Sequence, residues 1–306
     1  MQLFLATLIF GFAQGTINAL LGAGLVAAYR GTRVINFAHG SMAMFSTYVF
    51  VSLGDHRVPT VVSIAGGVLC GIVLGVLVDL LVMRPLAQHS YLVRIIATLG
   101  ILYVLQSLAL VVFNGGASRG VKAIFPHGGH RVGLITVSNN DIGIAVTAFA
   151  LAIGLTLFYH YTRFGTAIRA VSNSRDAATL VGIRVNWVTA ASWAIGGATG
   201  ALAGILLAPT LALDTYTLTL LVVQGFAAAL TGRLENLSGA LAGGIGLGIV
   251  TALAMNYVPE WTASHPQTWI NITHVDYLVS FLWIIGLLLF WRKPATTQQQ
   301  AGGLLL

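Results

Sequence analysis

The chain has 306 residues, of which 57% are hydrophobic and 8% are charged, and its mean hydropathy is +0.88. Charged residues make up about 25% of an ordinary soluble domain, so this composition excludes that class and indicates an integral membrane protein. The net charge of +7 comes from basic residues spread over the chain without the dense groove typical of nucleic-acid binding. We therefore predict a single membrane domain over residues 1–306 that contacts lipid and no nucleic acid.

Apolar runs follow one another along the whole chain. The first lacks a basic start and a small-residue cleavage site, so it is predicted as a membrane span and not as a signal peptide. Runs of roughly 17 to 25 residues are long enough to cross a bilayer as helices. The candidate segments are 5–29, 36–53, 60–83, 93–113, 141–160, 188–209, 214–231, 237–257 and 275–291. Because the second and seventh contain polar residues, we predict an all-α polytopic bundle of about eight or nine spans.

Residues 33–42, RVINFAHGSM, place polar side chains at the start of the second predicted span. The small residues that follow would let the backbone depart from a regular helix there. Non-helical backbone survives at membrane depth only where protein or a water-filled cavity satisfies its polar groups. One interpretation is therefore that Asn36, His39 and Ser41 border a translocation path. The other is that Asn36 caps a helix and His39 hydrogen-bonds a neighbouring span.

Other polar residues inside predicted spans allow a similar choice. Gln14 and Asn18 are four residues apart, so they share one face of the first span and either border the path or bridge two helices. Asp79 lies five residues before Arg84. Since charges within a membrane usually find partners, a local ion pair is favoured there over a proton relay.

The distribution of basic residues predicts the orientation. With the C-terminus in the cytoplasm, eleven of the fifteen Lys and Arg residues fall on the cytoplasmic side. The four that remain outside are Arg57, Arg119, Lys122 and Arg131. This bias is the one expected from the positive-inside rule.

The longest loop on the basic side runs from Tyr159 to Val188 and suits a pair of short helices. Ser174 can cap a helix that has Asp176 near its positive end, and Gly182 is a natural stop. Three apolar residues accompany this helix: Leu180, Val181 and Ile183. The helix would either dock into a partner protein or lie on the lipid headgroups.

Several motifs in this chain resemble one family of membrane proteins. The segment Asp176-Ala177-Ala178-x-x-x-Gly182 is similar to the EAA-x-x-x-G signature of ABC importer permeases. RVINFAHGSM, MRPLA, TRFGTAIRAVSNSRDAATLVGI and SGALAGGIGLGIV occur in the order found in the branched-chain amino acid permease family of those importers. The chain departs from the family at Gln224, where many relatives have lysine, and in TGRLENLSGA, which places Arg233 and Glu235 in a normally uncharged turn.

The resemblance implies a permease subunit of the bacterial inner membrane whose cytoplasmic loop, at about residues 160–187, docks on an ATPase subunit. The coupling residues that it implies are Arg169, Arg175, Asp176, Ala177, Ala178 and Gly182. Its implied partners are a homologous permease or a second copy, two ATPase subunits and an extracytoplasmic solute-binding protein. The implied cargo is a branched-chain or hydrophobic amino acid, with urea, short amides or another small solute as alternatives.

Motifs that are missing from the sequence limit the remaining functions. There is no G-x-x-x-x-G-K-[ST] loop, so we expect ATP on a partner chain and no cofactor in this one. The eight histidines lack metal-ligand spacing and no nucleophile motif occurs in a credible setting, so neither a metal site nor an enzyme is predicted. A stand-alone secondary transporter is the less favoured alternative, because Asp79 is the only acidic residue well within a predicted span.

Overall fold

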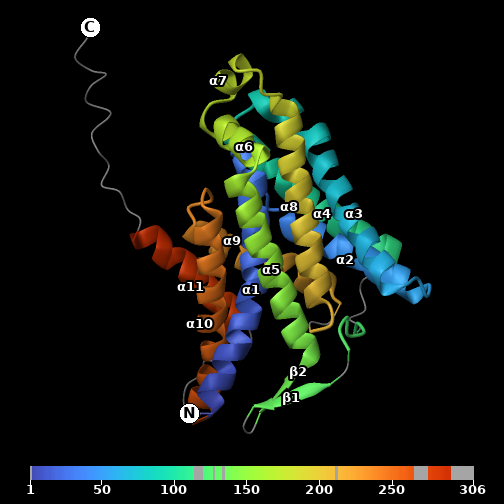
Figure 1. The fold of residues 1–306 in the computed structure, drawn as a ribbon, viewed down its shortest axis with the longest axis vertical. Coiled ribbons are helices and arrows are strands. Elements are labelled where there is room, and N and C mark those ends of the chain that lie inside the picture. Colours follow the sequence, from blue (N-terminus) through green and yellow to red (C-terminus); the bar gives the residue numbers. More distant parts are fainter. Residues whose placement is uncertain are drawn as a thin grey trace.

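The computed structural model describes residues 2–113, 120–126, 128–132, 135–210, 213–264 and 275–290, which form an elongated bundle of helices (Figure 1). The long helices are α1 (Gln2–Thr32), α2 (His39–Asp55), α3 (Thr60–Val78), α4 (Tyr91–Phe113), α5 (Asn139–Tyr161), α8 (Val185–Leu207), α9 (Thr215–Thr231), α10 (Leu237–Ser264) and α11 (Val275–Phe290). Each of them coincides with one predicted segment, which confirms the all-α membrane class.

Not all of these helices are equally suited to cross a membrane. Six of them, α1, α3, α4, α5, α8 and α10, are long and apolar enough to do so. Helices α9 and α11 are shorter apolar helices, and α2 has 17 residues. The structure therefore shows a multi-pass helical protein.

Shorter elements complete the described part of the chain. They are a π-helical turn (Asp79–Met83), a 3₁₀ turn (Pro85–Gln88), α6 (Arg163–Asn173), α7 (Arg175–Leu180), β1 (Gly129–Val132) and β2 (Ile135–Ser138). The antiparallel β1–β2 hairpin lies at the opposite end of the bundle from α7 (Figure 1). The sequence did not predict this hairpin, because its short strands alternate weakly within a polar loop. Ser138 ends the hairpin and caps α5 by accepting a hydrogen bond from the Asn140 amide at 3.2 Å.

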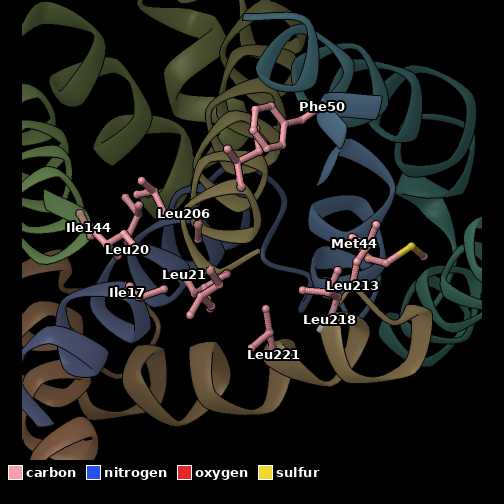
Figure 2. Packing of buried hydrophobic residues seen from close by; sticks show 14 of the residues in the cluster. Ile17, Leu20, Leu21, Met44, Phe50, Ile144, Leu206, Leu213, Leu218 and Leu221 are labelled. Atoms are coloured by element: carbon pink, nitrogen blue, oxygen red, sulfur yellow. The ribbon is translucent and has the colours of Figure 1, made fainter. Parts of the chain in front are cut away.

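Helix α1 occupies the centre of the bundle and contacts α5, α8, α9 and α10. Figure 2 shows Ile17, Leu20 and Leu21 of α1 packed among side chains from α2, α5, α8 and α9. Leu20 and Leu21 are completely buried. Because lipid tails are as apolar as leucine, such close packing contributes more to association inside a membrane than removal of apolar surface from water.

Glycine allows two of the helix pairs to pack backbone against backbone. A Cβ atom at Gly71 of α3 would collide with the Gly197 carbonyl oxygen of α8, and one at Gly248 of α10 would collide with Gly15 of α1. These contacts are the close approaches that small residues permit between membrane helices. The glycines at these positions therefore serve packing within the chain.

The outer helices leave large apolar side chains uncovered. In the most apolar 18-residue stretch of α4, only 17% of the residues are buried, compared with 67% in the corresponding stretch of α8. On α4, Tyr103 is 68% exposed and Val111 is 82% exposed. Such faces belong against lipid or a second membrane subunit, whereas α8 is an inner helix.

Two breaks interrupt the helices at the end of the bundle that carries α6 and α7. The first covers residues 33–38, so α2 begins at His39 and not at residue 36 as predicted. Arg33 has a φ of 57°, and the Asn36 side-chain oxygen accepts a hydrogen bond from the Ala38 amide at 3.0 Å. The second break joins α9 to α10, with a φ of 55° at Arg233. The backbone therefore leaves the helix before residue 39, whereas the small residues from Gly40 to Ala43, at which the sequence predicted a departure, are part of regular α2.

Candidate functional site

Helix α6 lies across the end of the bundle and leads directly into α7. The Thr162 side chain caps α6 by accepting a hydrogen bond from the Gly165 amide at 3.2 Å. Its apolar side, with Ile168 and Val171, is buried against the bundle. A Cβ atom at Gly165 would collide with the Tyr159 carbonyl oxygen, so this glycine lets the chain turn sharply out of α5.

Helix α7 has the start and the stop that the sequence predicts. The Ser174 side chain accepts a hydrogen bond from the Ala177 amide at 3.2 Å, and Asp176 is exposed in the first turn. At the other end, the Gly182 amide donates to the Thr179 carbonyl and the Ile183 amide donates to the Ala178 carbonyl, both at 3.0 Å. With a φ of 82° at Gly182, this is a Schellman ending, which favours glycine. A single turn-and-a-half of helix is thus fixed at both ends.

The predicted coupling residues divide into two groups in the structure. Asp176, Ala177 and Gly182 are exposed on α7 and its ending, and Arg175 is half-buried. Ala178 is only 2% exposed and packs against the bundle, and Arg169 donates to the Tyr159 carbonyl at 3.0 Å. Those two residues are therefore positioned to hold the α6–α7 unit and not to meet a partner directly.

Apolar side chains dominate the tip of α7. Leu180 is 89% exposed and Val181 is 75% exposed. In Figure 1, α7 projects from the end of the bundle. Two neighbouring apolar side chains on an exposed, doubly capped turn form a surface suited to contact another protein.

A cavity of about 600 Å³ lies between α6 and the start of α8, and sequence reasoning missed it. Its lining residues are Arg163, Phe164, Ala167, Ile183, Arg184, Trp187 and Val188. Phe164 and Trp187 meet edge to face with ring centroids 5.8 Å apart, and Trp187 is 63% exposed. The sequence signal that could have indicated this cavity is an arginine close to an aromatic residue at each end of the loop, Arg163 with Phe164 and Arg184 with Trp187.

Two arginines bind the loop that carries α6 and α7 to the membrane helices. Arg33 donates through Nε and Nη2 to the Ser172 carbonyl at 3.0 and 2.9 Å, and its Nη1 pairs with Glu235. The Glu235 carboxylate raises the pKa of the Arg33 guanidinium. This contact joins the C-terminal part of α6 to both helix breaks, and it uses the acidic residue that departs from the family pattern.

Arg84 makes the second attachment. Its Nε donates to the Asp79 carboxylate at 2.9 Å, and its Nη2 donates to the Asn186 carbonyl at 2.7 Å. The predicted local ion pair between Asp79 and Arg84 is confirmed. Since Asn186 lies in the first turn of α8, the pair connects the end of α3 to the place where the loop re-enters the bundle.

Four of the five residues predicted along a path lie in the packed interior of this one chain. Asn18, Asn36, His39 and Ser41 are at most 1% exposed, and Gln14 is half-buried. The Ser41 hydroxyl donates to the Ala38 carbonyl at 2.9 Å. Among the described residues, the cavities beside α2 and α3, beside α6, between α5 and α10, and along α11 are lined by none of these five.

His39 has the least ordinary surroundings of that group. Its ring is fully buried, and Cβ atoms added at Gly24 of α1 or Gly200 of α8 would lie 3.1 Å from its Cε1. Within the described residues, neither ring nitrogen makes a hydrogen bond of ordinary geometry. A buried imidazole without a well-formed hydrogen bond is energetically costly, which sets His39 apart from Asn36 and Ser41.

The opposite end of the bundle carries a cavity of about 480 Å³ beside α2 and α3. Asp55, Arg57 and Lys122 are among its lining residues, together with apolar residues such as Phe50 and Ile124. In the residues that the structure describes, no group of three or more His, Cys, Asp or Glu could hold a metal ion.

Comparisons with known proteins agree with a helical membrane permease. A family profile for the permease component of branched-chain amino acid transport systems matches residues 7–288. The chain therefore belongs to this permease family. The high-affinity branched-chain amino acid permease protein BraD of Pseudomonas aeruginosa is 27% identical, over 81% of this chain and 85% of that protein. The probable branched-chain amino acid permease protein LivH of Methanocaldococcus jannaschii is 31% identical, over 78% of this chain and 77% of that protein.

A solved structure shares the fold. The PsaBC complex from Streptococcus pneumoniae with a Fab matches with a TM-score of 0.51 and 12% sequence identity, over 98% of this chain and 95% of the matched chain. At this identity the likeness concerns only the arrangement of the helices.

Proposed function

We propose that this chain is the permease subunit of an ABC importer and forms the translocation path for a branched-chain or hydrophobic amino acid. Family membership supports the transport role. The observation that carries the ABC assignment is α7, a doubly capped helix that presents Leu180 and Val181 beyond the bundle. Two separate ATPase subunits bind and hydrolyse ATP, and this chain holds no cofactor and catalyses no reaction.

The proposed placement puts the α6–α7 end in the cytoplasm of a bacterium. Arg30, Arg33, Arg84, Arg163 and Arg184 all gather near that end, as the positive-inside rule requires. The protein then spans the inner membrane eight or nine times with its C-terminus inside. The cavity with Asp55, Arg57 and Lys122 faces the other side, where a solute-binding protein would deliver the cargo.

The path forms between this chain and a second copy or a homologous permease. We assign Gln14, Asn18, Asn36, His39 and Ser41 to its border. Because four of them are buried here, they meet the cargo only in a state in which α2 moves away from α1 and α8. A border of small and neutral polar groups suits a zwitterion with an apolar side chain better than a highly charged solute.

Uptake measurements test the cargo. The permease, its ATPase and its binding protein are expressed in a host that lacks its own branched-chain and urea systems. We expect ATP-dependent uptake of labelled leucine, isoleucine or valine. Uptake of urea or short amides instead would favour the alternative cargo, and uptake without the ATPase would favour a stand-alone secondary transporter.

Replacement of Gly182 tests the coupling assignment. Gly182→Val forces a β-branched residue to a φ of 82°, which costs about 1–3 kcal/mol and disturbs the end of α7. We expect the ATPase to stop co-purifying and uptake to be lost while the protein still inserts. Gly154→Val on α5 is the matched control, because a Cβ atom there meets nothing within 4 Å. Full assembly and transport by Gly182→Val would refute a docking role for α7.

A further inference from the structure

A third cavity, of about 370 Å³, lies between α1, α5, α6 and α10 at the α6–α7 end. Its lining residues are Arg30, Thr156, Tyr159, His160, Arg169, Asn236, Leu237 and Ser238. None of these residues is acidic. The cavity is separate from the tip of α7, so neither the coupling assignment nor the cargo accounts for it.

Arg30 is one of the two arginines that line this cavity. It occupies the last turn of α1 and is half-buried. Among the described residues, its guanidinium forms no direct hydrogen bond or ion pair. The nearby Glu235 pairs with Arg33. A half-buried guanidinium without a direct anionic partner calls for an anion from outside the chain.

Neighbouring groups add to the positive potential. Arg169 donates to the Tyr159 carbonyl at 3.0 Å and to the Thr166 hydroxyl at 3.2 Å, so its charge is held at the wall of the cavity without being neutralised. The 28-residue helix α10 begins there, and its amino end carries a partial positive charge. The Asn236 side chain orders that first turn by accepting from the Ser238 amide at 3.0 Å.

The position of the cavity indicates where the anion comes from. Leu157 and Phe158, in the same turns of α5, are 49% and 40% exposed and belong to an apolar surface that this chain leaves uncovered. The cavity thus lies where the apolar surface of α5 ends and the basic end of the bundle begins. The headgroups of the anionic cytoplasmic leaflet occupy this level.

We propose that this cavity binds the phosphate of an anionic phospholipid headgroup. Arg30 and Arg169 contact the phosphate oxygens through charge-assisted hydrogen bonds, and Ser238 adds a hydroxyl at the amino end of α10. The acyl chains follow the exposed surface of α5. The inference depends on the membrane placement of this end of the bundle and is independent of the transported solute.

Substitution of Ser238 tests the proposal without disturbing the fold. Ser238→Asp brings a negative charge into the cavity, while an acidic residue in the first turn of α10 favours the helix. Ser238→Asn has a similar size without the charge and is the matched control. The full chain, purified in a neutral detergent, is titrated with phosphatidylglycerol, phosphatidylcholine or inorganic phosphate, and bound lipid and thermal unfolding are measured.

We expect phosphatidylglycerol to bind and to raise the unfolding temperature of the wild type and of Ser238→Asn, with little effect of phosphatidylcholine. Ser238→Asp and Arg30→Gln should bind phosphatidylglycerol at least about tenfold more weakly, since a charge-assisted contact is lost or opposed. Arg163→Gln, an exposed arginine outside the cavity, should behave as the wild type. Equal binding by Ser238→Asp and Ser238→Asn would overturn the proposal. So would an equal response to both lipids, or a response to inorganic phosphate alone.

Discussion

Single side chains decide how the α6–α7 unit is held. Arg33 and Arg84 each reach from a membrane helix or its break to a backbone carbonyl of the loop, at Ser172 and Asn186. The pairing of Asp79 with Arg84 was predictable, because it is local in sequence. The Arg33 contact was not, since the two partners are 139 residues apart and only the folded chain brings them together. The surroundings of His39 could not be predicted for the same reason, because Gly24 and Gly200 come from two other helices.

Loss of Arg84 should destabilise the protein strongly. Arg84→Ala leaves the Asp79 side chain, which is only 1% exposed, without its cationic partner. An uncompensated buried charge of this kind costs about 3–5 kcal/mol. We expect a lower unfolding temperature in detergent for Arg84→Ala and substantial recovery when Asp79→Asn is added. Arg163→Ala, at an exposed site, is the control. A double variant no more stable than Arg84→Ala would show that the pair itself is not responsible.

At the scale of elements, periodicity and capping signals predicted most of what is seen. All nine apolar segments are helices, and Ser174 and Gly182 delimit α7 as expected. The boundaries of α2 and the β1–β2 hairpin were not predicted. Residues 33–38 combine a local contact, from the Ala38 amide to the Asn36 side chain, with distant ones, such as that between Arg33 and Ser172. Local sequence carries no information about such distant partners.

Removal of the α7 cap should weaken coupling without unfolding the membrane domain. Ser174→Ala deletes the hydrogen bond to the Ala177 amide, at a cost of about 1 kcal/mol to this short helix. We expect faster hydrogen exchange at Ala177 and weaker binding of the ATPase, with an unchanged unfolding temperature. Ser174→Asp retains a capping oxygen and should restore both properties. Unaltered exchange in Ser174→Ala would show that α7 does not depend on its cap.

At the scale of the whole molecule, the buried polar residues bear on alternating access. The sequence offered two interpretations of Asn36, His39 and Ser41, path or packing, and the structure of one chain shows them packed. Packing in one conformation is compatible with exposure in another, because the proposed path lies between this chain and a second subunit. The assignment of these residues to a path stays a prediction, because their accessibility depends on a partner and a conformational cycle that local sequence does not encode.

Cysteine labelling separates these interpretations. In the assembled transporter, His39→Cys on a Cys70→Ser background should react with a small polar thiol reagent in one nucleotide state and be protected in the other. Leu180→Cys, exposed on α7, reports whether the ATPase covers the tip in each state. Val111→Cys, on the exposed face of α4, is the control, because it shows how far lipid or a second subunit blocks the reagent at a side chain that this chain leaves uncovered. Complete inertness of His39→Cys in every state would leave packing as its role.

The exposed tip of α7 also has a consequence for the lifetime of the protein in the cell. If α7 docks on an ATPase as proposed, a permease made in excess of that partner leaves Leu180 and Val181 facing water. Uncovered apolar side chains are what quality-control proteases and chaperones recognise in unassembled subunits. The two side chains would then mark orphan permease for degradation, so that the amount of the ATPase limits the amount of permease. We expect the half-life of the chain to shorten when the ATPase is absent and to lengthen again in Leu180→Ser, Val181→Ser.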